Sequence, residues 1–113
     1  MENFTEKREF PRIKLKRPLG YRARGTHETN NTISENISLG GICFVTERFI
    51  APKTALAIEI DILTRMLCPI ASVVWSWPLP HSDRYHVGVE FLEFNQRDKN
   101  YLSDYIDCQA GRS

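Results

Sequence analysis

Two arginines lie four residues apart near the start of the chain, in the stretch KREFPR from Lys7 to Arg12. A guanidinium presents parallel N–H donors that match a phosphate or the O6 and N7 acceptors of guanine, and each bidentate pair contributes about 1–3 kcal/mol of discrimination. Pro11 disfavours helical geometry at Phe10. We therefore expect Arg8 and Arg12 on a looped or extended segment, from which both can approach one anionic ligand.

A second polar group follows in ENISLGG, residues 35–41. Asn36 and Ser38 project to the same side of an extended strand, roughly 7 Å apart, and their side chains can hydrogen-bond a base edge or phosphate oxygens. We expect Gly40 and Gly41 to turn the backbone through positive φ and to bring N–H groups close to an anion. Taken alone, the Asn-x-Ser-x-x-Gly pattern is more typical of an ordinary hairpin turn.

Positive charge is concentrated around the arginines, although the whole chain carries a net charge of only +1. Residues 7–24 contain eight Lys or Arg side chains and one acidic side chain, Glu9, so this segment carries +7. Such an asymmetry predicts a local anionic partner, because a binding surface needs positive potential only where the anion sits. A basic strand that is simply exposed to solvent remains the alternative.

Other kinds of chemistry are disfavoured. The three cysteines are odd in number and widely spaced, which argues against disulfides and a CxxC metal site and is typical of a reducing cytoplasm. The three histidines lack metal-ligand spacing and are expected on the surface. No motif of a hydrolase, metalloprotease or nucleotide triphosphatase occurs, so we expect no enzyme, metal or cofactor. With no signal peptide and no run of about 18 apolar residues, a cytoplasmic protein without a membrane span is expected.

Alternation of apolar and polar residues predicts that most of the chain forms β-strands. It is clearest in ALAIEIDIL, residues 55–63, where apolar side chains at every second position face one way. In TISENIS, residues 32–38, we expect Ser34 and Asn36 on the face opposite to Ile33. GICFVTE, CPIASVVWSW and YHVGVEFLEF are rich in the β-branched and aromatic residues that favour strands.

A helix is predicted at the end of the chain, with Asn95 as N-cap and Asp98 in the capping-box position. Gly111 lies past its end. Strands in succession followed by one helix predict an antiparallel barrel or sandwich with the helix packed against it, and 113 residues suit one domain with one core. The apolar stripe of the helix consists of Leu102, Tyr105 and Ile106.

The order of the two polar motifs, with about 23 residues between them, resembles the PilZ domain family of bacterial cyclic di-GMP receptors. Arg8 and Arg12 match the two arginines of that family's first motif. Asn36, Ser38 and Gly41 match its second motif, in which Asp or Asn is accepted at the first position. The strand pattern extends the resemblance over nearly the whole chain, because NISLGGICF and YHVGVEFLEF resemble later strands of the family.

The resemblance implies a single all-β domain over residues 1–113, built as a six-stranded antiparallel β-barrel with one C-terminal α-helix. Residues 1–7 would form a flexible arm and residues 107–113 a frayed tail. The implied function is that of a stand-alone cytoplasmic receptor for cyclic di-GMP, which signals to an unidentified downstream protein. Binding would order the arm over the barrel, a switch rather than a reaction.

Cyclic di-GMP carries two guanines and two phosphates, which suits the donors described above. In this family the position of Lys7 is associated with whether one ligand or a stacked pair is bound, and a basic residue there favours the pair. A tryptophan at the barrel rim often stacks on guanine in similar proteins, which points to Trp75, with Trp77 on the same face as the alternative. The implied ligand contacts are Lys7, Arg8, Arg12, Asn36, Ser38, Gly40, Gly41 and Trp75.

Two other functions stay open. A small β-barrel could bind single-stranded nucleic acid through its basic first strand and its tryptophans, and it would then show a steep salt dependence. The third possibility is a PilZ-type interaction module of pilus assembly that binds no nucleotide. Relatives of that kind lack the two motifs, whereas both are intact here.

Overall fold

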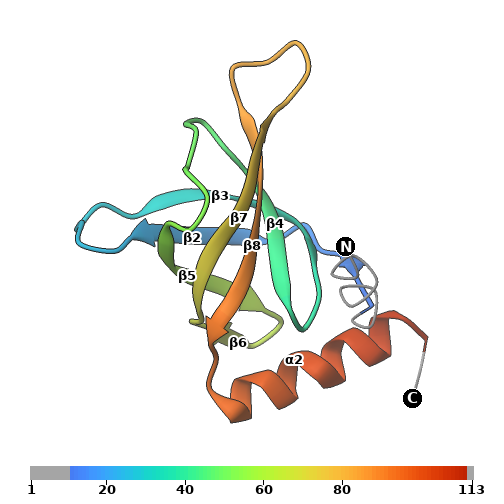
Figure 1. The fold of residues 1–113 in the computed structure, drawn as a ribbon. Coiled ribbons are helices and arrows are strands. Elements are labelled where there is room, and N and C mark those ends of the chain that lie inside the picture. The colour runs from blue at the N-terminus through green and yellow to red at the C-terminus, as the bar shows by residue number, and fades with distance from the viewer. Residues whose placement is uncertain (1–10, 112–113) are drawn as a thin grey trace, which may run out of the picture.

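The computed structural model describes residues 11–111, so the arm predicted for residues 1–7, Arg8 and the last two residues lie outside the described part. The described chain forms eight strands and one helix (Figure 1). These are β1 (Ile13–Lys14), β2 (Pro18–Ala23), β3 (Asn30–Ile37), β4 (Gly41–Thr46), β5 (Ala55–Ile62), β6 (Arg65–Leu67), β7 (Ile70–Pro78), β8 (Tyr85–Glu93) and α2 (Gln96–Gln109).

Six of the strands close into an antiparallel barrel. Their order is β3-β2-β5-β7-β8-β4, and pairing of β4 with β3 completes the circle. The two short strands extend existing edges, because β1 pairs with the end of β3 and β6 with the end of β5. Closure satisfies the backbone donors and acceptors of all six strands, which an open sheet would leave exposed at two edges. The predicted six-stranded barrel with a C-terminal helix is confirmed.

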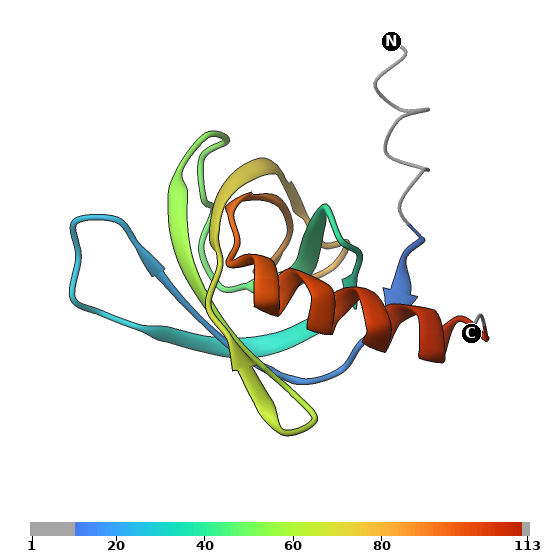
Figure 2. The same cartoon turned by 90° about the horizontal axis from the view of Figure 1, so that it is seen from below.

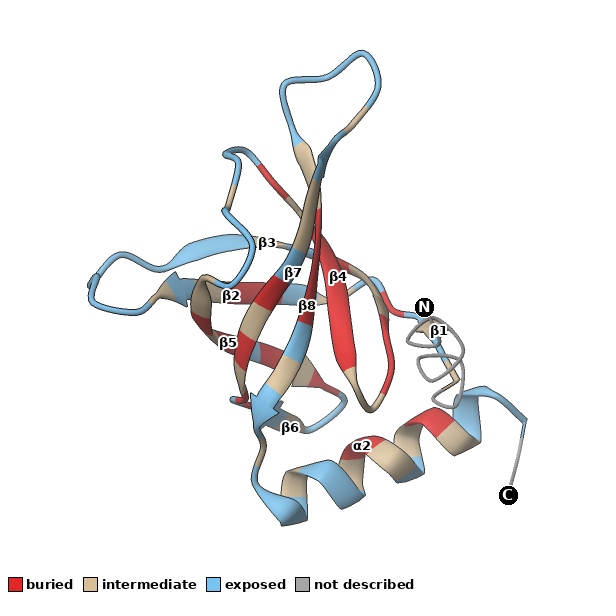
Figure 3. Ribbon diagram, viewed as in Figure 1, coloured by how far each residue is buried: buried red, intermediate tan, exposed pale blue. Residues whose placement is uncertain are grey.

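The hydrophobic core fills the barrel and continues onto one face of α2 (Figure 3). Leu102 and Ile106 of the helix belong to this core and are at most 2 % exposed, so α2 lies across one end of the barrel (Figure 2). The alternation predicted for β5 is confirmed, since its apolar side chains are at most 1 % exposed: Leu56, Ile58, Ile60 and Ile62.

The N-cap of α2 and the glycine after its last turn are as predicted, but the capping box is not. The side chain of Asn95 accepts hydrogen bonds from the backbone N–H groups of Arg97 and Asp98, which confirms the predicted N-cap. The Asp98 carboxylate does not complete a capping box; it accepts from Nε of Arg65 on β6 at 2.8 Å and ties the helix to the barrel. Gly111 follows the helix with φ of 78°, the left-handed conformation that commonly ends helices.

The alternation predicted for β3 is wrong at the centre of the strand. A β-bulge between Ser34 and Asn36 inserts an extra residue, so Ser34 points into the core at 0 % exposure while Ile33 is 49 % exposed. The buried hydroxyl is satisfied, because it donates to the carbonyl of Leu15 and accepts from the N–H of Arg17 at 3.0 Å. After the bulge the alternation resumes with Asn36 facing outward.

Candidate functional site

One row of paired residues crosses the outside of the barrel and brings distant parts of the chain together. Residues paired across antiparallel strands project to the same face of the sheet. The adjacent row is buried in the core and contains Ile37, Ile42 and Val89. The first row therefore faces outward, and we call it the outer row: Lys14 on β1, Asn36 on β3, Cys43 on β4, Gly88 on β8 and Trp75 on β7.

Arg12 lies over one end of the outer row. Its Nη1 donates to Oδ1 of Asn36 at 2.5 Å and approaches Sγ of Cys43 at 3.7 Å. Arg12 enters from the segment just before β1, whereas Asn36 comes 24 residues later on β3. The second arginine of the first motif and the first residue of the second motif are thus in direct contact on one surface.

Cys43 forms part of the floor beneath Arg12. Burial raises the pKa of the Cys43 thiol, and the nearby Arg12 guanidinium opposes that rise only in part. Because the pKa lies above its ordinary value, the thiol stays protonated at neutral pH. The charge of Arg12 is therefore not neutralised by a thiolate and remains available to an anion.

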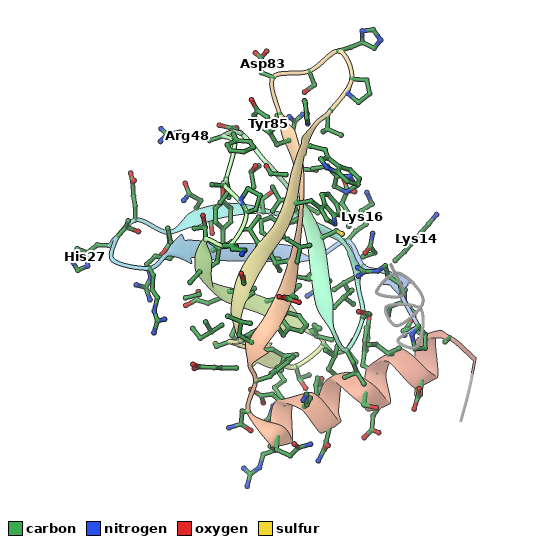
Figure 4. All side chains as sticks on the ribbon, viewed as in Figure 1. Lys14, Lys16, His27, Arg48, Asp83 and Tyr85 are labelled. Carbon is green, nitrogen blue, oxygen red and sulfur yellow. The ribbon has the colours of Figure 1, made fainter. Side chains whose placement is uncertain are left out.

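Basic side chains continue beside Arg12 on β1 and the segment that follows it. Lys14 and Lys16 are both exposed, and Figure 4 shows them on the side of the barrel where β1 meets β3. Lys14 pairs directly with Asn36 in the ladder. This end of the outer row therefore combines several positive charges with amide and guanidinium donors, a combination that suits phosphate oxygens.

The turn between β3 and β4 is held by its own hydrogen bonds. Ser38 is 2 % exposed; its N–H donates to the carbonyl of Gly41 at 2.9 Å, and its Oγ accepts from the N–H of Gly40 at 3.1 Å. The prediction that Gly40 and Gly41 use positive φ is wrong, since positive φ occurs among the described glycines only at Gly25 and Gly111.

Close packing of two strands explains why residue 41 is glycine. A Cβ at this position would lie 2.0 Å from the carbonyl oxygen of Val89, which is far inside van der Waals contact. Gly41 pairs with Glu90 on β8, and the N–H of Phe91 donates to the carbonyl of Gly40 at 2.9 Å. The missing side chain lets the β3–β4 turn sit against β8.

The other end of the outer row is aromatic. Trp75 stacks on Trp77 with ring centroids 4.4 Å apart and an angle of 19° between the planes. Its indole covers Gly88, where an added Cβ would meet ring atoms at 2.4–2.7 Å. Trp77 is 60 % exposed and Trp75 is half-buried, and both lie on the same face, as alternation predicted. The pair offers a flat apolar surface next to the polar end of the row.

A hollow of about 870 Å³ lies elsewhere on the barrel. It is lined mainly by polar residues of β2, β3 and the loop after β4, and Arg12, Asn36 and Trp75 are not among them. Burial, followed by the charge of Glu47, raises the pKa of Tyr21 in this hollow. None of the five residues of the outer row lines this hollow, whereas Lys16 and Glu35, which lie beside the row, do line it.

Comparison with known proteins identifies the family of this chain. Residues 6–108 match the PilZ domain. The chain belongs to the PilZ domain family. No curated protein matches this PilZ chain in sequence.

Solved structures share the fold of this PilZ domain. The Bacillus subtilis inhibitor of motility MotI/DgrA superposes with a TM-score of 0.75 at 23 % identity, covering 87 % of this chain and 48 % of that one. The PilZ domain of Escherichia coli YcgR with c-di-GMP gives 0.70 at 14 % identity and 92 % coverage of each chain. The K. pneumonia MrkH–c-di-GMP complex gives 0.68 at 14 %, covering 86 % and 48 %. The PilZ chain thus spans about half the length of MotI/DgrA and of MrkH.

The structure gathers part of the predicted site. Arg12 and Asn36 are in contact, Ser38 and Gly41 follow in the adjoining turn, and Trp75 lies in the same row as Asn36. Lys7 and Arg8 lie outside the described residues.

Other residues of the surface were missed by sequence reasoning. Cys43, Gly88 and His86 join it through strand pairing, and Glu35 joins it through its contact with His86, which is only 30 % exposed although it was expected on the surface. A glycine inside the strand VGVEF was the available signal, since such a glycine often marks a close approach.

Neither a metal site nor a membrane-spanning helix is found within residues 11–111. Within residues 11–111 no group of three His, Cys, Asp or Glu side chains is placed to hold a metal ion. In the same part of the chain, no helix has the length and apolar character needed to cross a membrane.

Proposed function

We propose that this PilZ domain is a receptor for cyclic di-GMP, bound on the outer row. The observation that carries the proposal is the contact of Arg12 with Asn36, which joins the two polar motifs at one point. From there the guanidinium can turn to a guanine Hoogsteen edge or a phosphate, while the stacked pair of Trp75 and the exposed Trp77 offers an aromatic face for base stacking, worth about 1–3 kcal/mol per base. Ser38 is 2 % exposed and its hydroxyl is bonded within the turn, so the contacts proposed for Ser38, Gly40 and Gly41 beside Asn36 would require this turn to open.

The N-terminal segment completes the proposed site. Lys7 and Arg8 precede Arg12 closely enough that a ligand held by Arg12 would bring them over the outer row. Ordering of this segment would change the surface that a partner protein meets, and ligand occupancy would be transmitted in this way. The c-di-GMP complexes of the relatives YcgR and MrkH support the choice of ligand.

Calorimetric titration with cyclic di-GMP and with cyclic di-AMP tests the proposal. We expect heat with cyclic di-GMP alone, because adenine lacks the O6 acceptor that an arginine fork requires. A stoichiometry above one ligand per chain would fit the stacked pair expected from Lys7. Equal heats from both dinucleotides, or none from either, would overturn the proposal.

Single substitutions then locate the site. Arg8→Ala, Arg12→Ala and Asn36→Ala are each expected to weaken binding about tenfold to a hundredfold, the loss that corresponds to one good bidentate or charge-assisted contact. The matched control is Arg24→Ala, which removes the same charge from the same basic segment at an exposed position in the turn after β2. Equal losses in Arg12→Ala and Arg24→Ala would indicate general electrostatic attraction instead of a site.

Binding of single-stranded nucleic acid predicts the opposite pattern. Affinity would fall steeply with salt and would be indifferent to Asn36→Ala. The structure gives this function less support, because part of the basic segment is engaged within the protein. Nε of Arg17 donates to the carbonyl of Asp61 at 3.2 Å, and Nη1 of Arg22 donates to the carbonyl of Thr26 at 3.2 Å.

A further inference from the structure

A line of contacts connects the bulge of β3 with the tryptophan end of the outer row. Nε2 of His86 on β8 lies 2.7 Å from Oε1 of Glu35 on β3. The imidazole ring of His86 in turn meets Trp75 edge-on, with centroids 5.3 Å apart and an angle of 81° between the planes. Since β4 lies between β3 and β8 in the sheet, the Glu35–His86 contact passes over a whole strand.

The β-bulge in β3 allows the Glu35 side chain to reach His86 across β4. Ser34 pairs with Phe44 and Asn36 with Cys43, so Glu35 is the extra residue that has no partner in the ladder. A bulge commonly re-aims a side chain in this way. In a regular strand Glu35 would alternate with Asn36 and point toward the core. The same bulge therefore sends Asn36 to the polar end of the row and Glu35 toward His86.

The nitrogen of His86 that faces Glu35 is buried. Nε2 has no contact with solvent, although the side chains of His86 and Glu35 are about 30 % exposed overall. The 2.7 Å approach of Oε1 of Glu35 falls outside hydrogen-bond geometry, so it is a close packing contact between the two side chains. Nε2 is therefore without a hydrogen-bond partner even with Glu35 present, and removal of the carboxylate would also take away a side-chain oxygen that lies beside this buried nitrogen, which is unfavourable.

Trp75 is held from three directions. Gly88 forms the floor under the indole, Trp77 stacks on one face, and His86 abuts the ring edge-on. Of these neighbours, Trp77 is 60 % exposed and Gly88 has no side chain, so neither can fix the ring in the plane of the sheet. His86 can do so, because its own position is anchored by Glu35.

We propose that Glu35 and His86 are positioning residues that hold Trp75, with Trp77 stacked on it, in the orientation required for a ligand base to stack on the pair. This inference rests on the proposed function for its consequence in binding, but not for its structural part. Glu35 adjoins Asn36 in the chain and reaches Trp75 through His86, so the pair sets the separation of the polar and aromatic ends of the site. Neither residue needs to touch the ligand.

The test combines a spectroscopic readout with binding. Stacked indoles give an exciton couplet in far-ultraviolet circular dichroism, and Trp77→Phe provides the spectrum without it. In the ligand-free protein we expect Glu35→Ala and His86→Ala to reduce the couplet, and Glu35→Gln to retain more of it because the amide oxygen can still face His86. Glu59→Gln is the matched control, since Glu59 is exposed on β5 and changes no contact of the tryptophans.

Affinity for cyclic di-GMP gives the second readout. Glu35→Ala and His86→Ala should each weaken binding about fivefold to tenfold, part of the contribution of one base stack, and the double variant should lose no more than the larger single loss. An unchanged couplet in both single variants would overturn the proposal, and so would loss of affinity without loss of the couplet, which would mean direct contact with the ligand. If the wild-type protein bound no cyclic di-GMP, the proposed function would fail, and the couplet alone would decide whether the pair holds Trp75.

Discussion

Replacement of Gly41 by alanine is expected to destabilise the barrel itself, whatever the ligand. The added Cβ would lie 2.0 Å from the carbonyl oxygen of Val89 and 3.1 Å from its carbonyl carbon. Because the obstruction is backbone and not the end of a flexible side chain, it cannot be relieved by a rotamer change. Strands β4 and β8 would have to separate by about 1 Å to restore an ordinary contact.

The cost can be worked from two contributions. Insertion of a methyl group into a packed site costs about 1–3 kcal/mol. Separation of the strands also weakens the neighbouring hydrogen bond from the N–H of Phe91 to the carbonyl of Gly40, and such a bond contributes about 1 kcal/mol net. The expected loss is about 2–4 kcal/mol, a large part of the stability of a domain of this size. It corresponds to a fall in Tm of roughly 10–15 °C.

Urea denaturation followed by tryptophan fluorescence measures this loss, with the slope m unchanged and the midpoint lowered. Gly20→Ala is the matched control, because a Cβ at Gly20 meets its nearest heavy atom, Cγ2 of Thr29, at an ordinary 3.4 Å. We expect that variant to stay within about 1 kcal/mol of wild type. A Gly41→Ala protein as stable as the control would refute the packing explanation for this motif glycine.

Two further predictions concern the stability contributed by the buried side chains of Ser34 and Cys43. Ser34→Ala should lower the free energy of unfolding by about 1–3 kcal/mol in urea, because it leaves the N–H of Arg17 and the carbonyl of Leu15 without their shared hydroxyl; an unchanged midpoint would contradict this. Burial raises the pKa of Cys43, so the folded state favours the thiol, and its contribution is present below the ordinary thiol pKa and lost as pH rises through the folded value. Unfolding measured between about pH 8 and pH 10 should therefore show a shallower decline in Cys43→Ala than in wild type, and identical slopes would argue against it.

Sequence reasoning predicted the structural features that depend on residues close together in the chain. Alternation in β5 reflects a side-chain period of two, which needs no knowledge of other strands. The helix cap at Asn95 depends on N–H groups only two and three residues away. The family resemblance then supplied the barrel, because the order of its motifs and strands is written along the chain.

Sequence reasoning predicted only those residues of the candidate site that belong to one of the two polar motifs. Arg12 and Asn36 were expected to share a ligand, and the structure places them in contact. The positive φ predicted for the glycine turn was wrong, and the constraint on Gly41 comes from Val89, 48 positions further along the printed sequence. No local pattern around Gly41 reveals that approach.

What the sequence determined by itself is therefore a barrel with a capped helix and two polar motifs of matched chemistry. What the tertiary structure decided is which side chains meet: Cys43 beneath Arg12, Gly88 beneath Trp75, and Glu35 against His86. The physical reason is that strand register and the β3 bulge are set by packing of the whole barrel. One inserted residue reverses the faces of every side chain beyond it, so the neighbours across a strand depend on contacts that no short stretch of sequence contains.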